Sequence, residues 1–210
     1  MHQKRSHSPT VVAVALLLAG LLPRPTPGIA QPKSPGSTVA GHASAVQATV
    51  FGNLGTVSTT MLADTGTLTN NKDVNDASQL TGDIPSLLSA EVLSATTLGY
   101  PDEVDSEASL GNLALTIAGI SITAESVVAQ ASKVSGAAGS GNSYIQDLAI
   151  NGARVTITGE PNQIVSIPGG QMVINEQAVS PTGTFVVNAL HVTVNGVADI
   201  LVASAPAGVS

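Results

Sequence analysis

The strongest chemical signal in the sequence is a histidine and an aspartate, His191 and Asp199, on either side of an Asn-Gly pair. A three-residue loop from Val194 to Gly196, with Gly196 in the left-handed conformation, would place the two directly opposite each other on neighbouring strands. A histidine held by a carboxylate is part of a hydrolase triad, but no serine lies in a G-x-S-x-G motif. We therefore interpret His191 and Asp199 as a surface ion pair between strands.

A second polar group, Asn175, Glu176 and Gln177, interrupts an otherwise apolar strand. One interpretation is a polar binding patch. The other is a hydrogen-bonded pair in which a four-residue loop, 180–183, places Asn175 opposite Asn188, because buried amides require partners. We favour the pair.

The candidate interaction residues are therefore Asn175, Glu176, Gln177, His191 and Asp199. The sequence predicts no catalytic residue, no cofactor and no dedicated metal ligand.

Two acidic runs, 71–76 and 102–107, resemble calcium loops in composition. An EF-hand loop requires Gly at its sixth position and Glu at its twelfth, and the first run has Asp76 and Gly82 there. We expect both runs to be solvated loops with at most weak Ca²⁺ binding.

Composition excludes several classes of function. The chain has no cysteine and no tryptophan, and only 10% of its residues are charged, against about 25% in typical proteins. Disulfides and thiolate chemistry are therefore excluded. Aromatic residues, whose rings usually stack on sugars, make up only 2% of the chain. Sugar binding therefore has little support.

The first thirty residues read as a secretory signal peptide. Lys4 and Arg5 precede an apolar stretch, 11–22, that is too short to span a membrane, and small residues end at Ala30. We predict cleavage near Ala30 and a secreted, extracellular protein without a membrane span in its mature part.

Removal of residues 1–30 leaves four basic residues against 14 acidic ones. That balance opposes binding to nucleic acid. The four basic residues are Lys33, Lys72, Lys133 and Arg154.

Residues 31–42 are rich in Pro, Gly and Ser and read as a flexible linker, and 43–208 read as one all-β domain. We predict an antiparallel β-sandwich or a related β-rich single domain, with a β-solenoid as the alternative. The expected strands are 43–51, 55–62, 87–97, 107–118, 120–132, 143–150, 153–159, 163–167, 171–178, 184–194 and 198–205. The expected loops are 64–86, 98–106 and 135–142.

Asn151-Gly152 predicts a hairpin with a two-residue type I′ turn. Its register places four apolar side chains on the core face and Arg154 on the opposite face, diagonal to Asp147. The four are Leu148, Ile150, Val155 and Ile157.

Several stretches resemble the choice-of-anchor P family of exported bacterial proteins. The most specific are PGGQMVINEQ at 168–177 and VNALHV at 187–192; 44–52, 107–131 and 200–208 are also similar. The resemblance implies a secreted domain whose relatives carry different C-terminal anchors, and it implies no known activity. Because the sequence has no LPxTG motif and no apolar tail, we expect a freely secreted form.

These observations predict a non-enzymatic bacterial cell-surface or extracellular domain with a structural or adhesion-like protein-interaction role. Its partner would be an unidentified protein or the cell-surface matrix. One alternative is a secreted hydrolase that uses acidic residues, which a deep pocket with two converging carboxylates would favour. The other is a Ca²⁺-stabilised adhesive module. Flat faces and exposed strand edges would favour the interaction domain.

Overall fold

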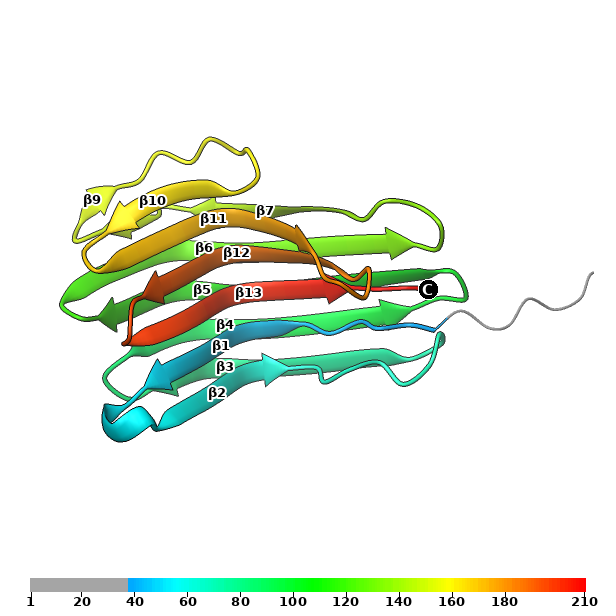
Figure 1. Cartoon of the computed structure of the whole chain (residues 1–210), viewed down its shortest axis with the longest axis horizontal. Coiled ribbons are helices and arrows are strands. Elements are labelled where there is room, and N and C mark those ends of the chain that lie inside the picture. Colours follow the sequence, from blue (N-terminus) through cyan, green and yellow to red (C-terminus); the bar gives the residue numbers. More distant parts are fainter. Residues whose placement is uncertain (1–37) are drawn as a thin grey trace, which may run out of the picture. The chain divides into compact units, whose positions relative to one another are not determined.

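The computed structural model describes residues 38–210. The predicted signal peptide and most of the predicted linker lie outside these residues. The described part consists of two antiparallel sheets packed face to face (Figure 1). The predicted all-β class and the β-sandwich are therefore confirmed, and the solenoid alternative is not adopted.

The first sheet has six strands in the order β10-β11-β12-β13-β1-β2. Their bounds are β1 Ser44–Phe51, β2 Val57–Asp64, β10 Gln163–Ile167, β11 Gly170–Val179, β12 Phe185–Val194 and β13 Ala198–Ala207. A short 3-10 turn, η1 (Asn53–Gly55), joins β1 to β2. The C-terminal third of the chain forms an antiparallel meander, as predicted.

The second sheet follows the order β3-β4-β5-β6-β8-β9, and β7 also pairs with β6. Its strands are β3 Val74–Ile84, β4 Leu88–Gly99, β5 Glu103–Ile117, β6 Ile120–Val134, β7 Ser140–Gln146, β8 Ala149–Ile150 and β9 Ala153–Arg154. Consecutive hairpins connect most of these strands. Figure 1 shows β2 and β3 at one side of the sandwich and β9 and β10 at the other.

Aliphatic side chains fill the space between the sheets. The largest fully buried ones include Leu93, Leu115 and Ile122 from the second sheet and Leu190 and Ile200 from the first. Burial of such side chains is the main favourable term in folding.

In both sheets the alternation of inward and outward side chains slips by one residue along a line across the strands. We call this slip a pleat inversion. In the first sheet two successive residues point inward, and one row of these is Asn175, Ala189, Ala203, Ala45 and Ala63, all buried. In the second sheet two successive residues point outward, as Glu91 and Val92 do on β4.

Left-handed backbone accompanies the inversion on alternate strands of the first sheet, and on the neighbouring strands β4 and β5 of the second sheet, at Val92 and Asn112. Asn175, Ala203 and Ala63 have φ values of 52°, 52° and 45°, and Val92 has 50°. Non-glycine residues adopt this conformation at a cost of about 1–2 kcal/mol each, so the surrounding ladder must hold them there.

The predicted loop 64–86 is wrong for its second half, which forms β3, eleven residues long. β3 lies at an edge of its sheet, and most of its side chains are exposed, so its sequence lacks the apolar alternation that marks a half-buried strand. The predicted loops 98–106 and 135–142 shrink to short turns for a similar reason, because polar residues on an outer sheet face resemble loop residues.

The predicted Asn151-Gly152 hairpin is confirmed in register. Ile150 pairs with Ala153, and Asn151 and Gly152 have φ values of 50° and 79°, as a type I′ turn requires. Arg154 forms an ion pair with Asp147 at 2.7 Å.

The ladder of this hairpin is shorter than predicted. Leu148 is buried and Val155 packs against the core, but regular pairing ends at Arg154. Beyond that residue the chain leaves the second sheet and crosses to β10 in the first.

Residues 38–42, expected as linker, run antiparallel to 206–210. Ala40 N–H donates to Gly208 O at 2.8 Å, and Val39 forms a bridge with Val209. The two ends of the described chain are therefore joined beside β1 and β13.

Candidate functional site

His191 lies on the outer face of the first sheet between two carboxylates. Its Nδ1 lies 2.9 Å from Glu176 Oε2, and its Nε2 lies 3.1 Å from Asp199 Oδ1. Asn188 Nδ2 also donates to Glu176 Oε2, at 2.6 Å. Strands β11, β12 and β13 thus bring together four polar side chains, three of which were predicted as interaction residues.

The two carboxylates hold the imidazole in its charged form. The hydrogen bond from His191 to Glu176 raises the pKa of His191 to about 9, against the opposing effect of burial. The same bond lowers the pKa of Glu176. Because a doubly protonated imidazole has no free lone pair, His191 cannot act as a general base at neutral pH. The cluster is an ion-pair network.

The predicted contact between His191 and Asp199 is present, but the predicted register is wrong. Asp199 pairs with Thr193, and His191 pairs with Leu201. The loop is Asn195–Val197, so the register is shifted by two residues and Asp199 reaches His191 diagonally. A shift of two keeps every side chain on its face, which is why the hydrophobic pattern did not distinguish the registers.

The predicted pair of Asn175 with Asn188 is wrong. The loop between β11 and β12 has five residues, Ser180–Thr184, so Asn188 pairs with Glu176. A shift of one residue moves a side chain to the other face. The pleat inversion sets the faces. Ala189 and Leu190 both point inward, so Asn188 points outward, to Glu176. Asn175 points inward with its neighbour Ile174.

Asn175 and Gln177 instead close one side of the sandwich. Asn175 Nδ2 donates to Gly159 O at 3.4 Å, and Gln177 Nε2 donates to Asn175 Oδ1 at 3.1 Å and to Gly141 O on β7 at 3.2 Å. Asn162 Oδ1 accepts from Gln177 N–H at 2.8 Å. These amides therefore tie β11 to β7 and to the crossing segment 155–162.

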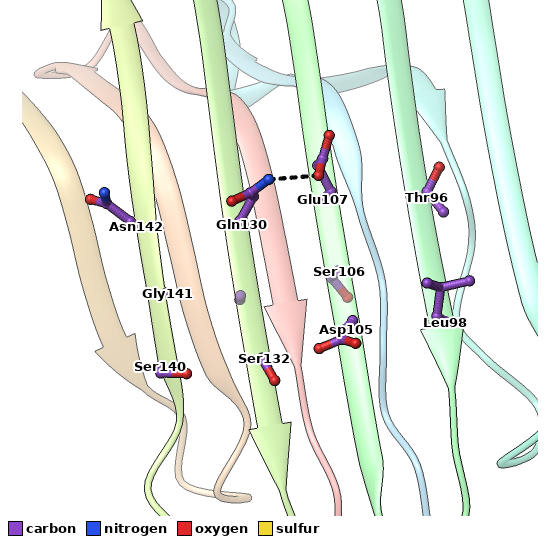
Figure 2. Close-up of a pocket in the computed structure, with 11 residues that line it drawn as sticks. Thr96, Leu98, Asp105, Ser106, Glu107, Gln130, Ser132, Ser140, Gly141 and Asn142 are labelled. Atoms are coloured by element: carbon purple, nitrogen blue, oxygen red, sulfur yellow. Dashed lines mark hydrogen bonds between the residues drawn. The ribbon is translucent and has the colours of Figure 1, made fainter. Parts of the chain in front are cut away.

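A depression lies elsewhere, on the outer face of β4, β5, β6 and β7 (Figure 2). Its volume is about 530 Å³. Figure 2 shows side chains from all four strands around it, with Gln130 Nε2 donating to Glu107 Oε2 at 2.7 Å. We call it the β4–β7 depression. Its lining residues are Thr96, Leu98, Asp105, Ser106, Glu107, Gln130, Ala131, Ser132, Ser140, Gly141 and Asn142.

Sequence reasoning missed this depression. The signal was present in the alternation of polar residues, as in Asp105 and Glu107 on β5 or Gln130 and Ser132 on β6. These residues share an outer face because successive side chains of a strand point to opposite sides. The first pair was hidden because 98–106 was assigned to a loop.

The two acidic runs lie in different parts of the second sheet: 71–76 spans the turn before β3 and the start of that strand, and 102–107 lies mostly on β5. Asp73 accepts hydrogen bonds from Thr69 and Asn70, including Asn70 Nδ2 at 2.6 Å, and closes the turn before β3. The hydrogen bond from the Thr69 hydroxyl lowers the pKa of Asp73 most. In residues 38–210 no group of three or more His, Asp or Glu side chains is placed to hold a metal ion.

The search of protein-family models, of curated proteins and of solved structures gives no match to this chain. Within residues 38–210, helical structure is too short and too polar to cross a bilayer.

Proposed function

We propose that the chain is an exported, non-enzymatic interaction domain of the bacterial cell surface or medium, with a structural or adhesion-like role. The observation that carries the proposal is the β4–β7 depression, an open surface built from four strands of one sheet and lined mainly by residues with polar side chains. Sites of this kind present hydroxyl, amide and carboxylate groups over an area rather than a reactive centre in a cleft.

The charge of the depression indicates the chemistry of the partner. Asp105 and Glu107 both line it. The ammonium group of Lys133, the residue after Ser132, donates a hydrogen bond to the carbonyl of Ala137 instead of to either carboxylate. A partner surface rich in Lys or Arg complements this charge, whether on a protein or on the cell-surface matrix. Such binding weakens as the salt concentration rises.

The hydrolase alternative requires two carboxylates that flank a substrate. Glu176 and Asp199 converge, but they converge on the imidazole of His191. This use of both carboxylates supports the interaction domain over the hydrolase.

A matched pair of charge reversals tests the proposal. Glu107 and Glu125 are both exposed carboxylates on the second sheet that accept from a glutamine on the next strand, at 2.7 and 2.6 Å, but only Glu107 lines the depression. We expect Glu107→Lys to weaken binding to cell-envelope material by about tenfold or more and Glu125→Lys to leave it unchanged. Equal effects of the two variants, or no salt-sensitive binding by the unaltered chain, would refute it.

Export is the second part of the proposal. The signal-peptide pattern of residues 1–30 and the resemblance to the choice-of-anchor P family support it. N-terminal sequencing of protein from the culture medium should give a start near Gln31. Intact Met1, or protein confined to the cytoplasm, would contradict it.

A further inference from the structure

The β2/β3 side of the sandwich is built unlike the opposite side. β3 is an edge strand of eleven residues, and it contains no Lys, Arg or Pro. Natural sheets usually protect their edges with such residues, with very short strands or with a covering segment. β3 therefore presents a long row of backbone donors and acceptors.

Exposed apolar side chains accompany this edge. Leu80 on β3 is 84% exposed, and Val92 on β4 is 66% exposed. The pairs Gln79 with Leu93 and Thr81 with Glu91 place Leu80 directly opposite Val92. Leu80 and Val92 form an exposed apolar pair on the outer face, at the edge of the sheet. We call this pair the Leu80–Val92 step.

The pleat inversion restricts what can pair with β3. Leu80 and Thr81 both point outward, between Gln79 and Gly82, which face the inner side. A strand added to this edge must have its own doubled outward pair at the same place, because facing residues of an antiparallel ladder point to the same side. An ordinary extended peptide lacks that feature, whereas β3 of another molecule has it.

We propose that β3 pairs with β3 of a second copy of this chain, antiparallel about a two-fold axis between Leu80 and Thr81, so that two second sheets become one continuous sheet. In this register Leu80 faces the second copy's Thr81, and the two Leu80–Val92 steps meet beside the axis.

Charge and side-chain direction agree with this register. Asp83 faces the second copy's Ser78, so neither carboxylate of β3 faces another, and Ala77 faces the second copy's Ile84 on the inner side. A two-fold pairing of this kind is closed and gives a dimer. Because a single edge buries an area at the low end of specific interfaces, we expect micromolar affinity.

Sedimentation velocity over a range of concentrations tests the dimer. We expect the unaltered chain to shift from monomer to dimer, and Leu80→Lys to weaken the association by about tenfold or more, because it brings two ammonium groups together beside the axis. Leu54→Lys is the matched control, since Leu54 is fully exposed on η1, between β1 and β2 of the other sheet. A monomer at all concentrations, or equal weakening by the two variants, would overturn the proposal.

Disulfide trapping tests the register independently, since the chain has no cysteine of its own. Residues beside the axis have Cα atoms about 6 Å apart in the dimer, within reach of a disulfide. We expect Leu80→Cys to form an intermolecular disulfide faster than Leu54→Cys, and Asp76→Cys to form one no faster than Leu54→Cys. Rapid trapping through Asp76→Cys, or none through Leu80→Cys, would overturn the register. Neither readout depends on binding at the β4–β7 depression.

Discussion

The two sides of the sandwich deal with their strand edges in opposite ways. At the β7/β10 side, segment 155–162 crosses from one sheet to the other. The Asn175 amide donates to Gly159 O in this segment, and the Gln177 amide donates to Gly141 O on β7. At the β2/β3 side, β3 keeps a long unpaired edge, and its own Leu80 is exposed. The difference indicates that polar residues inside an apolar strand can close a fold, whereas an ordinary polar strand can leave an edge for another molecule.

We call the β7/β10 side closed and the β2/β3 side open. The largest expected loss of stability lies in the hairpin that leads into the closed side. Leu148→Ala should destabilise the fold by about 3 kcal/mol, because Leu148 is buried and its loss leaves a cavity. Leu80→Ala, on the open side, should change the stability of the monomer by less than about 0.5 kcal/mol. Urea unfolding at low protein concentration measures both. Similar costs at the two positions would remove the contrast between the sides.

Asn175 tests how the closed side is held. Asn175→Ala loses the hydrogen bonds to Gly159 and Gln177 and leaves a Cβ at a φ of 52° without the tolerance of asparagine. We expect a cost of about 2 kcal/mol. Asn175→Gly restores the backbone but not the hydrogen bonds, so about 1 kcal/mol should remain. If Asn175→Gly is as stable as the unaltered chain, the side-chain hydrogen bonds do not hold this side.

The ion-pair network next to the closed side predicts a pH dependence. Because the pKa of His191 rises from 6.5 to about 9 on folding, its contribution is complete below pH 6.5 and is lost as the pH rises through about 9. Partial exposure screens the pair, so we expect a loss of about 1 kcal/mol.

Thermal unfolding of the unaltered chain and of His191→Gln measures this dependence. The difference in stability between the two should shrink as the pH rises through 9. Stability should also fall at acidic pH. Because folding lowers the pKa of Glu176, its contribution to stability is present above pH 4.5 and is lost on acidification. A constant difference between pH 6.5 and pH 10 would contradict the account of His191.

The smallest expected effect is a gain in stability on the open side. Val92 has a φ of 50°, which is unfavourable for a β-branched residue and tolerated by asparagine. Val92→Asn should therefore stabilise the monomer by about 0.5–1 kcal/mol. Val179, equally exposed at 66% on β11 and with ordinary φ, is the control, and Val179→Asn should give no gain. Destabilisation by Val92→Asn would show that the left-handed backbone there carries no strain.

Sequence reasoning predicted the parts of the fold in which local chemistry and burial agree. The hairpin at Asn151-Gly152 is an example, because its turn type and its apolar face specify the same register. β3 was missed because an exposed edge strand carries no apolar alternation.

Three of the five predicted interaction residues lie together in the structure, but the way they pair differs from the prediction. His191 and Asp199 do meet, and Glu176 joins them, but Asn175 and Gln177 belong to the inner side. The pleat inversion is the physical reason. It reverses the inward phase in the middle of a strand, and its left-handed residues, such as Ala203, have no distinctive sequence signature.

Amide hydrogen exchange at low and at high protein concentration tests the central claim most directly. We expect the amides of β3, residues 74–84, to become more protected as the concentration rises, because half of an edge strand's backbone groups face the second copy. The amides of β7 and β10 should exchange at the same rate at both concentrations. Exchange in β3 that does not depend on concentration, or added protection at β7 and β10 instead, would contradict the account of one closed and one open side.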